Sequence, residues 1–120
     1  MSRRTEQVGD LVQSVLADVI RRRVKRPALM SVMISITRVE VSADFARAKV
    51  HVSVLAEDRE RAEAMEALDR SESFLYRELK HEVHLRRVPR LEFIEDRSME
   101  EAGRLTALMR EVAESEGREL

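Results

Sequence analysis

Residues 36–55 read ITRVEVSADFARAKVHVSVL, and apolar side chains occupy every second position along most of this stretch. Ser42, Ala43 and Asp44 interrupt the alternation with residues typical of a tight turn. Side chains of a strand point alternately to its two faces, so the pattern predicts a β-hairpin with one buried and one solvated face. The solvated face of the second strand is basic and includes Lys49.

The parity of the alternation changes inside the first predicted strand. Ile34 and Ile36 share one parity. Val39 and Val41 share the other. A strand keeps both pairs on its buried face only if it contains an extra residue, so the sequence predicts a β-bulge near residues 37–38.

Apolar residues before the hairpin recur at i, i+3, i+4 and i+7, which predicts an amphipathic helix over residues 5–25. Pro27 is expected to end this helix, because the residue before a proline disfavours the helical conformation. The last turn is strongly basic, and such cations stabilise the negative end of a helix or bind phosphates. The residues to which both interpretations apply are Arg22, Arg23 and Lys25.

Two further helical patterns follow the hairpin, over residues 57–70 and residues 74–84. The interruption between them consists of Ser71, Glu72 and Ser73. Pro89 and the apolar run 91–94 then predict a third strand. Together with a final helix, the order helix, strand, strand, helix, helix, strand, helix predicts a single α+β domain whose three-stranded sheet carries its helices on one face.

The final helix is predicted to begin at Ser98, where Glu101 three residues later would complete a capping box. Its apolar stripe consists of Met99, Ala102, Leu105, Leu108, Met109 and Val112. We expect the stripe to cover the domain's own core, because a small sheet needs covering. Docking of a protein partner or of a second copy is the alternative. The acidic residues after Ala113 are expected to fray. The predicted domain therefore comprises residues 1–97, and the C-terminal helix with its tail comprises residues 98–120.

The composition argues against several classes of function. The chain has no cysteine, which excludes disulfides and thiol chemistry. His81 and His84 lack a fixed third ligand, so we expect no metal. No glycine lies in a phosphate-cradling loop and no serine in a nucleophile elbow, so we expect neither catalysis nor a cofactor. No signal peptide or membrane-spanning run is visible, which favours the cytoplasm.

The formal net charge of −1 conceals a strong asymmetry along the chain. Residues 1–26 carry seven Arg or Lys against three acidic residues, and residues 77–90 carry five against two. Residues 91–120 carry four against nine. The basic run continues past the helix end to Arg90, where helix-dipole compensation does not explain it, which favours phosphate binding over a merely solvated surface. Tyr76 and three phenylalanines are too few to predict a base-stacking sheet.

Three segments of this sequence resemble the bacterial ribosome-binding factor A family. The hairpin carries the pattern V-E-V-S-x-D-x-x-x-A-K-V, and residues 85–93 carry L-R-x-V-P-x-L-x-F. The third segment is the triplet Asp96, Arg97 and Ser98. The resemblance covers about residues 3–110 and implies a type II KH-like domain, in the order α-β-β-α-kink-α-β, followed by a C-terminal helix.

The resemblance also implies a function. Family members are non-catalytic, cytoplasmic assembly factors that bind 16S rRNA in the immature 30S subunit. They promote late 16S rRNA maturation and processing, and they are especially important in the cold. They leave the subunit when it is complete, in some bacteria with the help of a GTPase. The resemblance therefore implies an RNA-binding monomer that needs no cofactor and no membrane.

The residues expected to contact RNA are the cations of the two basic segments and of the hairpin. They are Arg22, Arg23, Lys25, Lys49, Arg77, Lys80, Arg86, Arg87 and Arg90. The KH-like kink is expected at Ser71, Glu72 and Ser73, where Ser73 replaces the glycine that the family usually has. Glycine would permit close backbone approach to a phosphate more readily than serine does.

Overall fold

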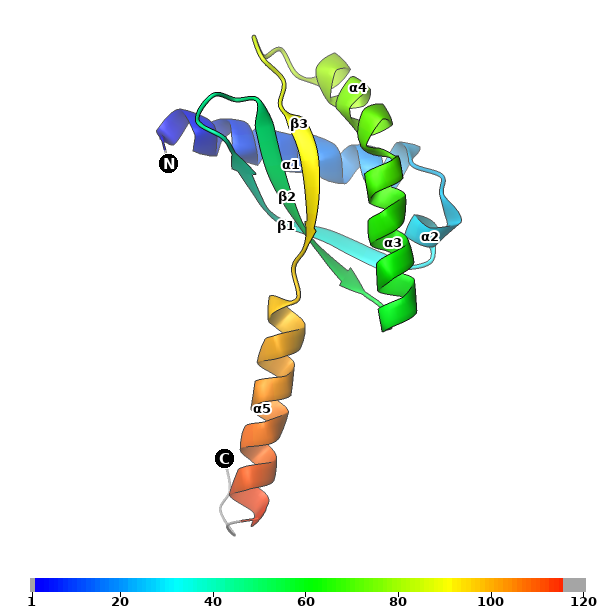
Figure 1. The fold of residues 1–120 in the computed structure, drawn as a ribbon, viewed down its shortest axis with the longest axis vertical. Coiled ribbons are helices and arrows are strands. Elements are labelled where there is room, and N and C mark those ends of the chain that lie inside the picture. The colour runs from blue at the N-terminus through cyan, green and yellow to red at the C-terminus, as the bar shows by residue number, and fades with distance from the viewer. Residues whose placement is uncertain (1, 116–120) are drawn as a thin grey trace.

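The computed structural model describes residues 2–115, and within this range the chain forms five helices and three strands (Figure 1). In chain order they are α1 (Arg3–Arg23), α2 (Pro27–Met30), β1 (Met33–Val41), β2 (Arg47–Leu55), α3 (Asp58–Arg70), α4 (Glu72–Glu82), β3 (Arg90–Glu95) and α5 (Ser98–Ser115). The predicted α+β order is confirmed. The short helix α2 was not predicted: α1 ends at Arg23, and Pro27 begins α2, because its fixed φ suits the first position of a helix.

The sheet has the order β1-β2-β3, with β1 antiparallel and β3 parallel to β2. The alternate residues Ala48, Val50 and Val52 are fully buried, which confirms one buried face. The β1–β2 register shifts between Ile36 and Arg38, which confirms the predicted bulge. At that position the side-chain amide of Gln13 donates to the Ile36 carbonyl oxygen over 2.8 Å, so α1 satisfies a backbone acceptor of the edge strand.

Helices α1, α3 and α4 cover the buried face of the sheet, as the sequence predicts. Leu16, Leu68, Leu75 and Leu79 are fully buried beneath or between these helices. Gly9 lets α1 lie directly on β1, because a Cβ atom there would come within 2.7 Å of the Val39 carbonyl oxygen. Because the covering helices all lie on this one face, the opposite face of the sheet is open.

Helix α5 projects from the end of β3 away from the rest of the molecule (Figure 1). The prediction that its stripe covers the domain's own core is therefore wrong. Leu105 and Leu108 are 59% and 56% exposed, and Met109 and Val112 are about half exposed. The physical reason is that α1, α3 and α4 already cover one face of the sheet, while α5 starts beyond the sheet's end. Fraying was predicted from just after Ala113, but Glu114 and Ser115 still belong to α5, so this part of the prediction is wrong; its remainder lies outside the described residues.

The start of α5 is capped differently from the prediction. Ser98 is already helical, and its backbone N–H donates to Asp96 Oδ1 over 2.9 Å. The Glu101 N–H bonds to the Arg97 carbonyl oxygen, so the Ser98–Glu101 capping box is wrong. Asp96 also accepts from the hydroxyl of Thr37 over 2.7 Å, which ties the start of α5 to β1.

These hydrogen bonds predict a pH dependence of stability at Asp96. The bond from Thr37, followed by those from Ser98, lowers the pKa of the Asp96 carboxyl from 3.8 to about 2. A carboxyl with a lowered pKa in the folded state stabilises the fold above its unfolded pKa and loses this effect as it becomes protonated. We therefore expect Asp96→Asn to be less stable than the parent at pH 6, and the difference to disappear between pH of about 4 and about 2. Urea unfolding across this range measures it, and a difference independent of pH would contradict it.

Candidate nucleic-acid interface

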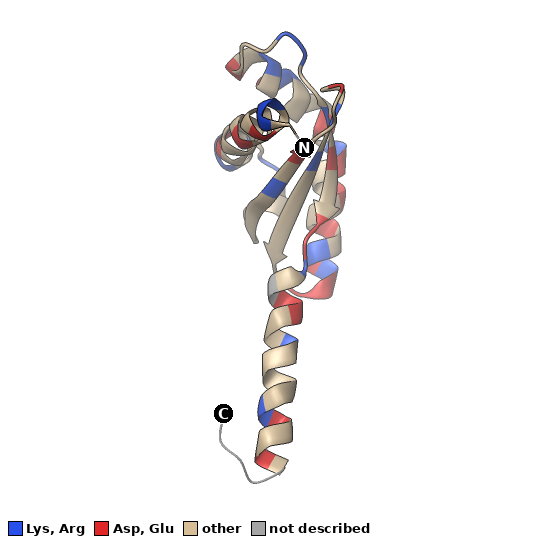
Figure 2. Cartoon of the chain, turned by 90° about the vertical axis from the view of Figure 1, so that its left-hand side faces the viewer, with Lys and Arg blue, Asp and Glu red and all other residues tan. Residues whose placement is uncertain are grey.

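The connection between α4 and β3 forms a basic concavity of about 370 Å³. Its lining includes the cationic side chains of Lys80, Arg86, Arg87 and Arg90. The hairpin turn adjoins it: Ala46 lines the concavity, and its carbonyl oxygen accepts from the Arg90 N–H over 2.9 Å. Figure 2 shows cationic residues along this connection, at the end of the molecule opposite α5. The structure thus brings together four of the nine predicted RNA-contacting residues.

Tyr76 positions two of these cations. The Arg90 guanidinium lies 4.1 Å from the centre of the Tyr76 ring, and the Lys80 ammonium lies 5.3 Å from it. The two cationic groups are therefore no more than about 9.4 Å apart, the sum of the two distances. A cation over an aromatic face is attracted to the ring without losing its charge. Tyr76, for which no binding role was predicted from the sequence, thus orders part of the basic surface.

The nine predicted cations differ in whether a carboxylate neutralises them. Arg22 pairs with Asp18. Arg23 pairs with Glu78 at 3.3 Å, and Arg90 pairs with Glu72. Among the described residues, no carboxylate forms an ion pair with Lys25, Arg77, Lys80, Arg86 or Arg87. The cations available for phosphate are thus concentrated on the second half of α4 and the loop after it.

Lys49 lies apart from this group, on the open face of the sheet. Its cross-strand neighbours are Glu40 on β1 and Glu92 on β3. A lysine between two carboxylates presents little net positive charge. The structure therefore does not bring Lys49 together with the cations of the α4–β3 connection.

The kink between α3 and α4 uses its polar groups internally. Ser71 is buried; its hydroxyl donates to the Ala67 carbonyl oxygen and accepts from Arg26 Nε, both over 2.8 Å. Glu72 accepts from the Leu91 N–H over 2.9 Å, in addition to its pair with Arg90. The backbone at Ser71 is ordinary, with φ of −90°, so the turn itself requires no glycine. The Glu72 carboxylate thus holds the start of β3.

Ser73 lies within α4 and is exposed, which makes the missing glycine testable. We expect Ser73→Gly to lower the free energy of unfolding by about 0.5 kcal/mol, because glycine disfavours a helix more than serine does. Ser73→Ala should raise it by about the same amount. We expect neither change to alter subunit binding, because the kink's polar groups are already engaged. Urea unfolding and co-sedimentation measure both effects, and tighter binding by the glycine variant alone would contradict this account.

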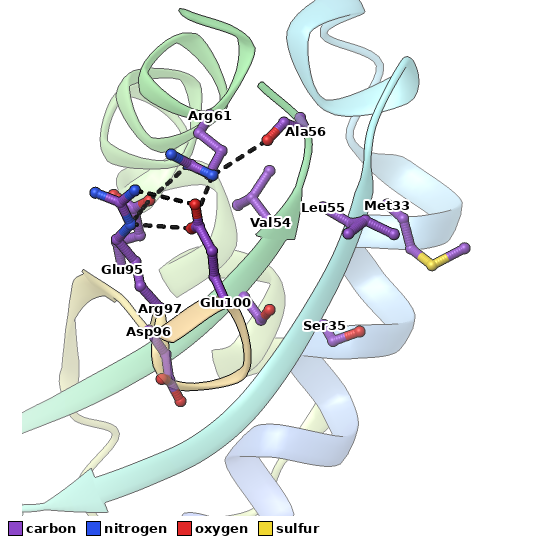
Figure 3. Close-up of a pocket in the computed structure, with 11 residues that line it drawn as sticks. Met33, Ser35, Val54, Leu55, Ala56, Arg61, Glu95, Asp96, Arg97 and Glu100 are labelled. Atoms are coloured by element: carbon purple, nitrogen blue, oxygen red, sulfur yellow. Dashed lines mark hydrogen bonds and ion pairs between the residues drawn. The ribbon is translucent and has the colours of Figure 1, made fainter. Parts of the chain in front are cut away.

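An ionic cluster around the buried Arg61 joins α3, the end of β3 and the start of α5 (Figure 3). The Arg61 side chain is only 10% exposed, and its guanidinium contacts three carboxylates, those of Asp58, Glu95 and Glu100. Arg97 makes a second set of contacts to the same carboxylates. This cluster was not predicted from the sequence. A signal was available, because Arg61 lies at i, i+3, i+7 spacing with Ala64 and Leu68, on the buried side of α3.

Two other kinds of site are absent from the described part of the chain. Within residues 2–115, no group of three or more His, Cys, Asp or Glu side chains is arranged to hold a metal ion. In the same range, every helix is too short or too polar to cross a bilayer.

Comparison with known proteins gives consistent matches. The family model described as ribosome-binding factor A matches residues 4–109. A ribosome-binding factor A from Picosynechococcus sp. PCC 7002 is 38% identical over 119 residues, covering 99% of this chain and 91% of the relative. The crystal structure of ribosome-binding factor A from Thermus thermophilus is similar, with a TM-score of 0.66, 28% identity, and coverage of 76% of this chain and 93% of that one. A homology model of the T. thermophilus factor, fitted into a cryo-EM map of its complex with 30S, has a TM-score of 0.61 and 29% identity over 74% of this chain and 91% of that one.

Proposed function

Because this chain belongs to the ribosome-binding factor A family, we propose that it binds the 30S ribosomal subunit by contacting RNA phosphates with one basic surface. We name this the α4 loop surface; it consists of Arg77, Lys80, Arg86, Arg87 and Arg90. The observation that carries the proposal is the concentration of cations without a carboxylate partner around the concavity at Tyr76. The T. thermophilus factor fitted into a 30S complex supports the choice of partner.

The RNA bound is 16S rRNA in the immature subunit, and it is read through its backbone. Arginine and lysine side chains contact phosphates at any sequence, whereas base readout needs directed contacts to base edges or stacking. In the α4 loop surface the aromatic ring of Tyr76 already faces Arg90 and Lys80, which leaves it poorly placed to stack a base. Arg22, Arg23 and Lys25 add a weaker flank, since two of the three are paired with carboxylates.

The chain acts as a non-catalytic, cytoplasmic assembly factor that works as a monomer. It promotes late maturation and processing of 16S rRNA, with its largest importance in the cold, and a ribosome-assembly GTPase assists its release. The family relationship supports these roles. The α4 loop surface supports the RNA-binding step alone.

The salt dependence of binding tests the proposal. Each neutralised phosphate releases counterions, and four cations without carboxylate partners predict a slope of about −3 in a plot of log affinity against log salt concentration. Co-sedimentation with purified immature 30S subunits between low and moderate salt gives this slope. Binding that does not change with salt would contradict phosphate contacts, and equal binding to mature 70S ribosomes would contradict the assembly role.

A further inference from the structure

A second concavity lies at the opposite end of the sheet from the α4 loop surface. It has a volume of about 630 Å³ and lies between the end of β2 and the start of α5 (Figure 3). β3 leaves the sheet after pairing Glu95 with Val52, so residues 53–55 of β2 have no neighbouring strand on that side. The apolar part of the lining includes Met33 and Leu55, which are cross-strand partners and are 67% and 73% exposed. Large apolar side chains exposed together mark interaction sites.

The apolar stripe of α5 lies on the side of the helix that is turned away from α3. Glu100 contacts Arg61 of α3, which fixes the rotation of α5 about its axis. Leu105 lies about 140° around the helix from Glu100, so the stripe points away from α3. The open face of the sheet, with Met33 and Leu55, also points away from α3. We name the exposed stripe the α5 surface; it consists of Leu105, Leu108, Met109 and Val112 and lies beyond the concavity, along the projecting part of α5.

The charge around the α5 surface is negative. Helix α5 carries four glutamates and two arginines. The concavity's two arginines, Arg61 and Arg97, are occupied by carboxylates of their own cluster. Asp58, Glu95 and Glu100 are these carboxylates, so the two arginines do not neutralise the other glutamates of α5. RNA phosphates would be repelled from this end of the molecule.

The same charges argue against a second copy as the occupant. Two α5 helices in contact would bring like net charges together, and Glu101 lies within the apolar stripe at its first turn. The four large apolar side chains of the stripe also offer much less area than the roughly 800 Å² per partner that a stable dimer buries. A cationic partner with apolar side chains satisfies both requirements, because its charge complements the glutamates and its apolar groups cover the stripe.

We propose that the α5 surface docks a basic, amphipathic segment of a protein of the 30S particle. This inference rests on the proposed function. Proteins that bind RNA are rich in lysine and arginine, so such a particle exposes segments of the required chemistry. The molecule extends 61 Å along its longest axis, with the α4 loop surface at one end and α5 at the other. It therefore contacts rRNA and protein at two separated places.

Site-specific photo-cross-linking on immature 30S subunits tests this assignment. A benzophenone amino acid replaces Leu108 in one variant and Arg87 in another, and both are irradiated after co-sedimentation. We expect cross-links from position 108 to a basic ribosomal protein and from position 87 to 16S rRNA. Cross-links from position 108 to rRNA, to a second copy of the chain or to nothing overturn the inference while position 87 still reports RNA binding. Failure to co-sediment even without the label overturns the proposed function and this inference with it.

A pair of matched variants supplies a second measurement. Leu105→Ser with Leu108→Ser removes apolar area from the exposed stripe, and we expect subunit affinity to fall about tenfold or more. Gly103→Ser with Ala107→Ser changes the opposite side of α5, where a Cβ at position 103 meets no atom, and should leave affinity unchanged. Thermal unfolding should be nearly the same for both, because all four positions are exposed. Equal affinity of the two double variants overturns the inference.

Discussion

Replacing Arg86 and Arg87 together with glutamate is expected to weaken binding to immature 30S subunits by at least about a hundredfold at moderate salt. A hydrogen bond to a charged group contributes about 1.5–3 kcal/mol, so the removal of two phosphate interactions already corresponds to this factor, and the new negative charges add repulsion. The slope of log affinity against log salt should become less steep by about two, one for each phosphate that is no longer neutralised. Folding should not suffer, since both side chains are exposed and form no ion pair with a described carboxylate.

Arg38→Glu with Arg59→Glu is the matched control. It changes the net charge of the chain by the same amount, but its side chains are exposed on β1 and α3, and neither belongs to the α4 loop surface or to α5. We expect it to bind subunits within about twofold of the parent at the same salt concentration. If both double variants lose affinity equally, net charge rather than the α4 loop surface governs binding. If the Arg86 and Arg87 variant still binds, phosphate contact by this loop is wrong.

The hairpin and its bulge could be predicted because strand periodicity is a local signal. The change of parity between Ile36 and Val39 predicted the bulge within one residue of the observed register shift. The kink at Ser71 was visible for the same reason, as an interruption of two helical periods. The position of α5 was not, because a stripe of apolar residues has the same periodicity whether it packs on its own domain or on a partner.

The sequence predicted which cationic residues belong to the candidate site better than it predicted how they are arranged and paired. The cations that line the concavity stood out because their run continues past the end of a helix. Charge counting could not show that Arg23 is paired with Glu78, 55 residues away, or that Arg90 is paired with Glu72. Nor could it show that Lys49 lies on the open face between two carboxylates. Pairing between distant residues depends on the fold, and the fold decides which charges remain available to a ligand.

Replacing Arg61 with methionine is expected to lower the free energy of unfolding by about 2–3 kcal/mol, because it leaves the partly buried carboxylate of Glu95 without its nearest cation. Glu95 is the most affected. Its Oε1 atom is buried without a hydrogen-bond donor and lies 3.2 Å from Arg61 Nε, an attraction that is Coulombic rather than a directed hydrogen bond. Arg97 is 3.9 Å from the same atom and compensates less. Urea unfolding of the variant measures the loss, which is a large share of a typical stability of about 5–15 kcal/mol.

Arg59→Met is the matched control for Arg61, since it removes an arginine from the same helix. Arg59 is 91% exposed and pairs only with Glu63, one turn away, so its loss should cost no more than about 0.5 kcal/mol. A double variant with Arg61→Met and Glu95→Leu should recover much of the stability, because it removes the unpaired carboxylate together with its partner. If Arg61→Met and Arg59→Met are equally stable, the cluster does not hold α3, β3 and α5 together. A cluster that does hold them also fixes the direction of α5, because Glu100, the residue of α5 that Arg61 contacts, lies in its first turn.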